Sequence, residues 1–224
     1  MGSFRSHPAV PYVLPFAVFL FFLAAQSYIP LPGHWDYPFR VAVLAAILWI
    51  FSRRALDFRA TAPVASILLG AGVFVLWIGP DLLIPGYRGH WLFQNSLTGK
   101  LETSIPANLL NSTMVLVFRT LRAVIIVPII EELFWRGWLM RWLIAKDFER
   151  VPLGAYQRQA FWITAVLFAS EHGPYWDVGL LTGIVYNWWM VRTRRLGDLI
   201  LAHAVTNACL CVYVIVTGKW EYWL

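Results

Sequence analysis

The sequence predicts an all-α membrane protein, a bundle of about seven or eight transmembrane helices around a polar intramembrane cavity. Of the 224 residues, 59% are hydrophobic and only 13% are charged, whereas a soluble domain carries about 25% charged residues. Long apolar runs recur along the chain, and most of the basic residues lie in short segments between them. The few charged side chains inside the runs are costly there, so each marks a candidate site.

The N-terminal part, residues 1–111, contains three apolar runs and one long polar interval. Residues 11–31 are long enough to span a bilayer, and no small-residue cleavage site follows, so we expect a membrane helix rather than a signal peptide. Further spans are expected at residues 39–51 and 62–79, where Gly70 and Gly72 allow close helix contact. Residues 80–111 are expected to form an extracytoplasmic loop.

The C-terminal part, residues 112–217, holds most of the intramembrane polar residues. Its first apolar stretch, residues 114–144, is too long for one untilted span at about 1.5 Å per residue. Pro128 can kink this stretch or split it in two. Later spans are expected at residues 160–172, 176–191 and 198–216, and Gly179 and Gly183 have the spacing of tightly packed helices. Because no linker or repeat divides the chain, we expect one membrane domain over residues 1–224.

Basic clusters at residues 53–59, 141–158 and 192–195 set the expected orientation. All three fall on one side of the membrane if there are about seven crossings, and basic loops face the cytoplasm. The N-terminus is therefore expected to be cytoplasmic, and the net charge of +6 indicates orientation rather than nucleic-acid binding. Cys209 and Cys211 point about 200° apart on a helix, which favours two small apolar residues over a disulfide or a zinc knuckle.

Three spans that are far apart in sequence carry acidic or histidine side chains at similar depth. At about 1.5 Å per helical residue from the cytoplasmic arginines, Glu131 lies about 15 Å, His172 about 21 Å and His203 about 12 Å into the membrane. Three unrelated positions would not be expected to share a similar depth. We therefore expect these three side chains to meet in one polar site.

Spacing within the helices indicates separate roles for the two adjacent acids. Glu132 and Arg136 form an i,i+4 pair with the acid first, the better orientation, while Glu131 points about 100° away and stays free for chemistry. The pair could equally be structural, holding helices together. His203 and Asn207 are also four residues apart, so both project from one helix face.

Other polar residues of the spans have weaker signals. Phe168 lies four residues before His172, so its ring can shelter that imidazole. A lone membrane His or Asn more often bonds a neighbouring helix than takes part in catalysis, and Asn187 is expected to serve packing or hydrogen bonding. Arg119 and Arg122 are expected to snorkel to an interface or to pair with a carboxylate. The role of Glu171 is ambiguous, because the adjacent His172 is the residue predicted to face inward.

At these residues the chain resembles the type II CAAX prenyl endopeptidases and their bacterial relatives, the CPBP or Abi proteins. The family pattern is Glu-Glu-xxx-Arg, then Phe-xxx-His, then His-xxx-Asn, each on a membrane helix. Here the three motifs read Glu131-Glu132-Leu-Phe-Trp-Arg136, Phe168-Ala-Ser-Glu-His172 and His203-Ala-Val-Thr-Asn207. Any one motif is weak, but the ordered triple in a polytopic protein is specific. The resemblance covers about residues 131–207.

The resemblance implies an intramembrane endopeptidase without a covalent nucleophile or a cofactor, with its catalytic core in residues 112–217. Glu131 would activate water with the help of His172, and His203 and Asn207 would stabilise the oxyanion. Glu132 and Arg136 would hold the helix, with Phe168 in support. The substrate would be a lipidated or membrane-associated peptide or protein that enters from the cytoplasmic side and partly from the membrane lipid. The relatives indicate a bacterial inner membrane.

Three other functions stay open at this point. Glu131, His172 and His203 would form a legitimate His₂Glu catalytic zinc shell, although the chain has no His-Glu-xx-His and the family is described as metal-independent. A rhomboid-like serine protease is disfavoured, because no Gly-x-Ser-x-Gly-like element lies inside a span. A scaffold or transporter could use the same polar network for helix packing or a proton path. The substrate, its prenylation and the oligomeric state are not indicated.

Overall fold

The computed structural model describes residues 7–25 and 33–223, and it confirms the all-α class, since every named element of the described residues is helical. The main helices are α1 (Val10–Ala25), α2 (Asp36–Ile47), α3 (Pro63–Leu83), α4 (Thr113–Leu121), α5 (Val127–Glu132), α6 (Met140–Trp142), α7 (Arg158–Ser170), α8 (Trp176–Thr193) and α9 (Leu196–Thr217). Wider π-helical turns extend or connect some of them, at η3 (Leu48–Ser52), η6 (Arg122–Ile126) and η7 (Leu133–Leu139).

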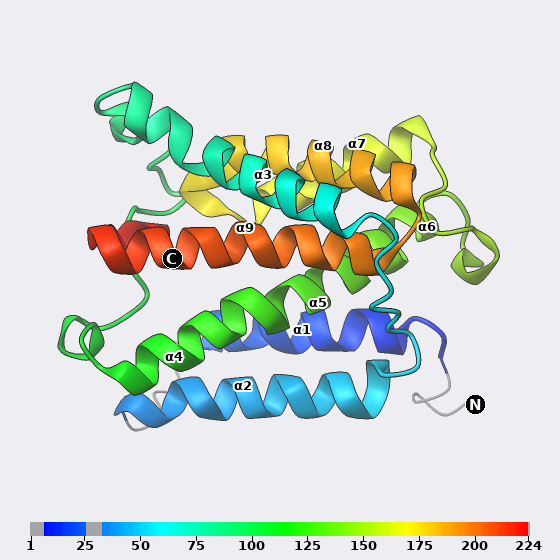
Figure 1. The fold of residues 1–224 in the computed structure, drawn as a ribbon, viewed down its shortest axis with the longest axis horizontal. Coiled ribbons are helices and arrows are strands. Elements are labelled where there is room, and N and C mark those ends of the chain that lie inside the picture. Colours follow the sequence, from blue (N-terminus) through cyan, green and yellow to red (C-terminus); the bar gives the residue numbers. More distant parts are fainter. Residues whose placement is uncertain (1–6, 26–32, 224) are drawn as a thin grey trace.

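The helices run roughly along one common direction and stack in layers (Figure 1). Helices α1 and α2 form one side, the helix that contains α4 and α5 crosses the middle beside α9, and α3, α7 and α8 cover the other side. Within these layers α3 packs along α9, and α7 packs along α8. Helix α9 is thus central, with contacts to α3, α5 and α8.

Helices α4 to α6 form one continuous helix, Thr113–Trp142, so Pro128 does not split this stretch. The Val127 N–H bonds the Arg122 carbonyl in an i,i+5 register. In that register the Ala123 carbonyl would need the N–H of residue 128, which proline lacks. The Asn207 side-chain amide donates to the Ala123 carbonyl instead, at 2.7 Å. A side chain from α9 therefore supplies the hydrogen bond that proline removes.

Three helices of the described residues are long and apolar enough to cross a membrane: Pro63–Leu83, Thr113–Trp142 and Leu196–Thr217. Helix α1 is apolar but shorter, and residues 26–31 of the predicted first span lie outside the described residues. The three helices support an integral membrane protein, while the expected count of seven or eight crossings is not confirmed. Large apolar side chains on their outer faces are exposed, among them Leu68, Val75 and Val216, as suits contact with lipid.

Glycines set the close approach of two helix pairs. A side-chain carbon built on Gly70 would lie 2.3 Å from the Ala202 carbonyl oxygen of α9, so only glycine fits there. Gly183 brings α8 close to Ala165 of α7, where a side-chain carbon would lie 3.1 Å from its carbonyl oxygen. Gly72 was expected to make a similar contact, and that prediction is wrong, because nothing lies within 4 Å of the corresponding position.

Asp198, at the start of α9, fixes the start of α3. Its carboxylate accepts hydrogen bonds from the backbone N–H groups of Thr61 and Ala62, at 2.9 and 2.8 Å, and from the hydroxyls of Thr61 and Ser66. These donors lie at the N-terminal end of α3, where unpaired N–H groups favour an anion. The side chain therefore joins two helices that both contribute to the cavity described below.

Arg88 anchors the long loop to the start of α8. Its guanidinium bonds the Asp177 carboxylate at 2.6 Å and the Pro174 carbonyl at 2.7 Å, and it pairs with Asp81 at 3.2 Å. Pro174 belongs to η9 (Gly173–Tyr175), the turn that directly follows His172. The loop thus holds in place the turn from which one candidate site residue projects.

Candidate active site

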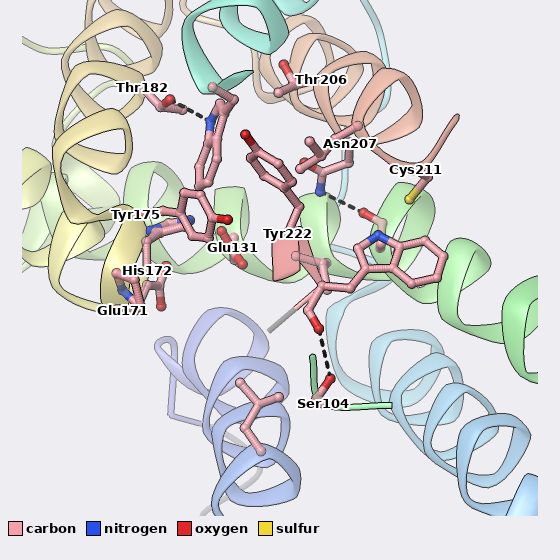
Figure 2. Close-up of a pocket in the computed structure, with 18 of the residues that line it drawn as sticks. Ser104, Glu131, Glu171, His172, Tyr175, Thr182, Thr206, Asn207, Cys211 and Tyr222 are labelled. Atoms are coloured by element: carbon pink, nitrogen blue, oxygen red, sulfur yellow. Dashed lines mark hydrogen bonds between the residues drawn. The ribbon is translucent and has the colours of Figure 1, made fainter. Parts of the chain in front are cut away.

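One cavity of about 480 Å³ contains most of the predicted site residues. Glu131, Phe168, His172, His203 and Asn207 all line it, and they come from the long helix, from the end of α7 and from α9. Figure 2 shows the acid and histidine side chains on one side of the cavity and Asn207 on another. The expectation that three distant spans meet in one site agrees with this placement.

Glu132 and Arg136 pair as expected, but behind the cavity. The guanidinium Nη1 donates to both Glu132 carboxylate oxygens, at 3.2 and 3.1 Å, and both side chains are 0% exposed. Arg136 also donates from Nε to the Asn187 side-chain oxygen at 2.8 Å, and its guanidinium lies 4.5 Å from the centre of the Phe168 ring. Asn187 thus has the hydrogen-bonding role that the sequence predicts, since it also donates to the Phe161 carbonyl.

His203 contacts Glu132, whereas the sequence predicts that Glu131 faces both histidines. The His203 Nδ1 lies 2.8 Å from Glu132 Oε1. Because an ionised carboxylate only accepts hydrogen bonds, Nδ1 carries a proton in this contact and Nε2 is left for a ligand. Glu132 therefore links Arg136 and His203, and it orients the imidazole as the aspartate of a catalytic triad does.

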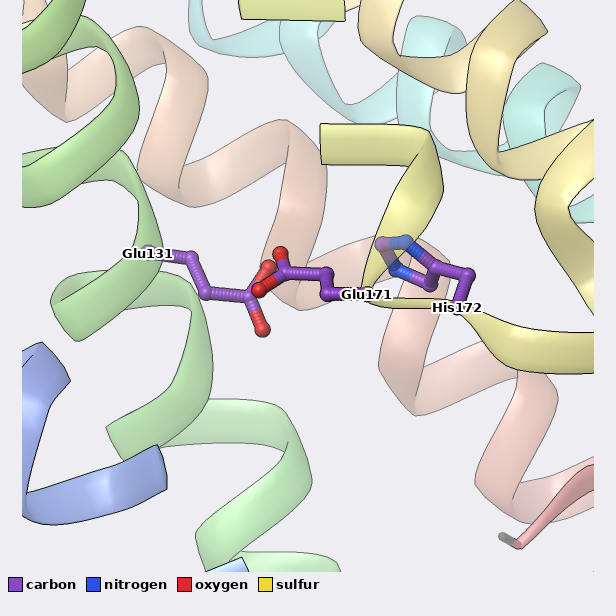
Figure 3. Close-up of side chains that lie close together, drawn as sticks. All are labelled: Glu131, Glu171 and His172. Atoms are coloured by element: carbon purple, nitrogen blue, oxygen red, sulfur yellow. The ribbon is translucent and has the colours of Figure 1, made fainter. Parts of the chain in front are cut away.

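Glu131 faces a different pair of residues, Glu171 and His172. Ligand atoms of the three side chains all lie within 4.8 Å of one another, and Figure 3 shows the Glu131 and Glu171 carboxylates directed toward each other. Glu131 is 6% exposed, and its Oε2 has no hydrogen-bond partner among the described residues. A buried carboxylate oxygen without a partner is costly, so this group is positioned for a ligand.

His172 is held in one tautomer by the last turn of α7. Its Nδ1 lies 2.7 Å from the Phe168 carbonyl oxygen, and a carbonyl only accepts, so Nδ1 is the protonated nitrogen. The Phe168 ring covers the imidazole with its centre 4.6 Å away, as the four-residue spacing predicts. Gly179 of α8 provides the room, since a side-chain carbon there would lie 3.2 Å from the imidazole. The unprotonated Nε2 can therefore accept a hydrogen bond from water.

One N–H of the Asn207 side-chain amide bonds a backbone carbonyl, and the other can bond a ligand. It donates to the Ala123 carbonyl in the contact that compensates for proline. The side-chain amide has two N–H donors, and the residue lines the cavity. The bond to Ala123 fixes the plane of the amide, and the second N–H can serve a ligand.

Glu171 is the site residue that sequence reasoning missed. A helical projection assigned the inward face to His172, but α7 ends at Ser170 and the chain turns there, so the projection does not apply. Trp135, in the first motif, donates from its indole nitrogen to Glu171 Oε1 at 2.9 Å. The breaker Gly173-Pro174 was the signal that the helix could not continue past these residues.

Arg119 and Arg122 do not extend to an interface, which corrects one expected role. Both are buried, at 9% and 5% exposure, and both line the cavity. The Arg119 guanidinium lies 5.8 Å from the centre of the Trp223 ring. The cavity thus has an acidic end near Glu131 and a basic part along the same helix.

The donor set permits a metal ion in principle. Two carboxylates and one imidazole are acceptable ligands for zinc and similar ions. The cluster differs from the predicted set, however, because Glu171 takes the place of His203, whose Nδ1 contacts Glu132. Any metal chemistry would therefore use Glu131, Glu171 and His172.

One family model matches part of the chain. The family model described as type II CAAX prenyl endopeptidase Rce1-like matches residues 111–209. This confirms the resemblance that the three motifs indicate, and it places the helices of the cavity from α4 to most of α9 within the matched segment. Searches among curated proteins and among solved structures gave no match.

Proposed function

We propose that this protein is an intramembrane endopeptidase of the CAAX-protease or CPBP type that uses Glu131 to activate water. The observation that supports this most is the buried Glu131 carboxylate, one oxygen of which has no hydrogen-bond partner among the described residues. It lies within 4.8 Å of His172 in a cavity of about 480 Å³, large enough for a peptide segment. A family match over the same helices supports the reaction class. A packing role alone does not require an unpartnered acid at a cavity.

The reaction is a direct attack of water on a peptide carbonyl. Glu131 takes a proton from the water while the neutral Nε2 of His172 accepts the water's other hydrogen and positions it. The oxygen attacks the carbonyl carbon and the π electrons move to the carbonyl oxygen. The proton held by Glu131 then passes to the amide nitrogen as the C–N bond breaks, which gives a carboxylic acid and an amine.

Two residues of α9 are placed to stabilise the oxyanion. The free N–H of Asn207 is one donor. His203 is the second donor when both of its ring nitrogens carry a proton. Its Nδ1–H is bonded to Glu132, so its Nε2–H is the one that donates to the oxyanion. The Glu132 carboxylate would stabilise such an imidazolium, while the Arg136 guanidinium holds that carboxylate in place. Glu171, which accepts from Trp135, lies within 4.8 Å of Glu131 and His172 and would contact the same water molecule.

The substrate class follows from the surroundings of the site. The cavity wall combines these polar groups with apolar and aromatic side chains such as Phe19, Leu23 and Trp77, and the surrounding helices are suited to lipid. A peptide with a lipid chain or a hydrophobic segment would reach such a site from the membrane. A prenylated peptide with a C-terminal CAAX sequence is therefore the first substrate to test.

The direct experiment is cleavage of a farnesylated CAAX peptide by the purified protein, followed by mass spectrometry. Release of the C-terminal fragment supports the proposal. If no fragment forms, peptides from membranes of cells with and without the protein should be compared, because another membrane peptide can be the substrate. A protein that processes no peptide in either experiment is a scaffold or transporter instead.

A zinc-dependent protease is the second candidate, favoured by the grouping of Glu131, Glu171 and His172 within 4.8 Å. A metal bound there would supply a more acidic water molecule. Dialysis against a chelator separates the two mechanisms. Water activation by Glu131 alone predicts unchanged cleavage after dialysis, whereas loss of cleavage that is restored by zinc supports the metal.

A further inference from the structure

We infer that Arg122 forms an anion subsite that binds the free C-terminal carboxylate of the substrate peptide. This inference rests on the proposed function, and it adds how the enzyme selects the end of a chain. The first observation is that the Arg122 guanidinium is buried at the cavity without a partner among the described residues. Arg122 is 5% exposed and lines the cavity, and none of the hydrogen bonds or ion pairs among the described residues involves its side chain.

Such a group is unusual in this environment. A guanidinium remains charged at any relevant pH, and burial of a charge without a partner is strongly unfavourable. Other buried arginines have protein acceptors: Arg40, Arg88 and Arg136 pair with carboxylates. Arg141 donates to backbone carbonyls instead. An intramembrane cation that lines a cavity, with no hydrogen-bond acceptor or carboxylate partner among the described residues, is therefore best explained by an anionic ligand.

The depth of Arg122 favours a ligand inside the cavity over a lipid headgroup. The continuous helix Thr113–Trp142 has 30 residues, so Arg122 lies about five residues, or about 8 Å, from its middle. If the helix is centred in the bilayer, this position is inside a hydrocarbon layer whose half-thickness is about 15 Å. Lipid phosphates lie beyond that boundary, whereas a peptide in the cavity can bring its carboxylate to this depth.

The spacing between Arg122 and Glu131 fits a substrate whose C-terminus lies a few residues from the bond that is cleaved. Arg122 precedes Glu131 by nine residues, which corresponds to about 13 Å along the helix. An extended peptide advances about 3.4 Å per residue, so about four residues separate the two side chains. A carboxylate on Arg122 would therefore place a bond a few residues from the C-terminus over Glu131. Arg119 lies one turn farther out, and Lys100 and Glu102 line the cavity from the loop.

The test compares a farnesylated CAAX peptide that has a free carboxylate with the same peptide as its C-terminal amide. Binding is measured by fluorescence anisotropy on the Glu131→Gln protein, so that affinity is read without cleavage and separately from the proposed catalysis. Because a hydrogen bond to a charged group contributes about 1.5–3 kcal/mol, the free acid should bind about 10- to 150-fold more tightly. Adding Arg122→Gln should bring the two peptides within about twofold of each other.

Two further variants serve as matched comparisons. Arg150→Gln changes an arginine that is outside the cavity and 87% exposed, and it should keep the full preference for the free acid. Arg122→Lys retains a point charge without the fork geometry and should keep part of the preference. Thermal unfolding of each variant verifies folding, and Arg122→Gln should not lower stability, since it removes an unpaired buried charge.

Three results would overturn the inference. Equal binding of acid and amide by the protein with Arg122 intact excludes carboxylate recognition, and an unchanged preference in Arg122→Gln assigns that recognition elsewhere. Mixed micelles with phosphatidic acid test the other anion source. If Arg122→Gln weakens binding of phosphatidic acid and leaves the acid-to-amide ratio unchanged, the ligand is a lipid phosphate. A protein that binds neither peptide also lacks the subsite, whether or not it cleaves another substrate.

Discussion

Glu131 and Glu132 are adjacent acids, yet the structure predicts opposite effects on stability when each is changed to glutamine. Both Glu132 oxygens accept from Arg136, at 3.2 and 3.1 Å, and one also contacts His203 at 2.8 Å. Removing one partner of a fully buried ion pair costs about 3–5 kcal/mol. For a chain of this size each kcal/mol lowers Tm by about 2–4 °C, so Glu132→Gln should lower it by about 6–20 °C.

Glu131→Gln should instead leave Tm unchanged or raise it. One Glu131 oxygen has no partner among the described residues, and the Glu171 carboxylate lies within 4.8 Å, so the substitution removes a like-charge repulsion at little cost. The measurement is thermal unfolding of both variants and the wild type, purified in one detergent at one pH. Equal losses of Tm in the two variants, or an unchanged Tm in Glu132→Gln, would refute this division between a structural and a functional acid.

Three further predictions concern packing, a helix cap and catalysis. Gly70→Val should lower Tm markedly, because a side-chain carbon there would lie 2.3 Å from a backbone oxygen of α9, while Gly72→Val, the matched control in open space, should not. Asp198→Ala leaves four hydrogen-bond donors without their acceptor, and denaturant unfolding should show a loss of about 1–3 kcal/mol or more. Glu171→Gln should lower kcat about tenfold or more with an unchanged Tm, since the Glu171 carboxylate lies within 4.8 Å of Glu131 and His172 and accepts from Trp135, a bond that the glutamine oxygen can keep. An unchanged kcat would remove Glu171 from the mechanism.

Much of the site could be predicted from the sequence because membrane helices restrict the possibilities. A helix rises by a constant amount per residue, so distance from the basic clusters indicated that Glu131, His172 and His203 share a depth. Spacing of four residues predicted the Glu132–Arg136 pair, which the structure confirms at 3.1 Å. These inferences required only that each segment be a regular helix.

The remaining features depend on places where the helices are irregular or on contacts between them. His203 contacts Glu132 rather than Glu131 because of how α9 packs against the long helix, which the sequence of either helix alone does not specify. Glu171 enters the site because α7 ends one residue earlier. Pro128 leaves the long helix intact because Asn207, far away in sequence, supplies the missing donor.

The most direct test of the proposed mechanism is the cleavage rate of Glu131→Gln relative to the wild type, measured on one farnesylated CAAX peptide or on a substrate identified in cells. Tm and peptide affinity should be measured on the same preparations, so that loss of the base is separated from loss of fold or binding. We expect cleavage to fall below detection while Tm and affinity are retained. A Glu131→Gln protein that binds and cleaves the peptide at the wild-type rate would contradict the assignment of Glu131 as the base.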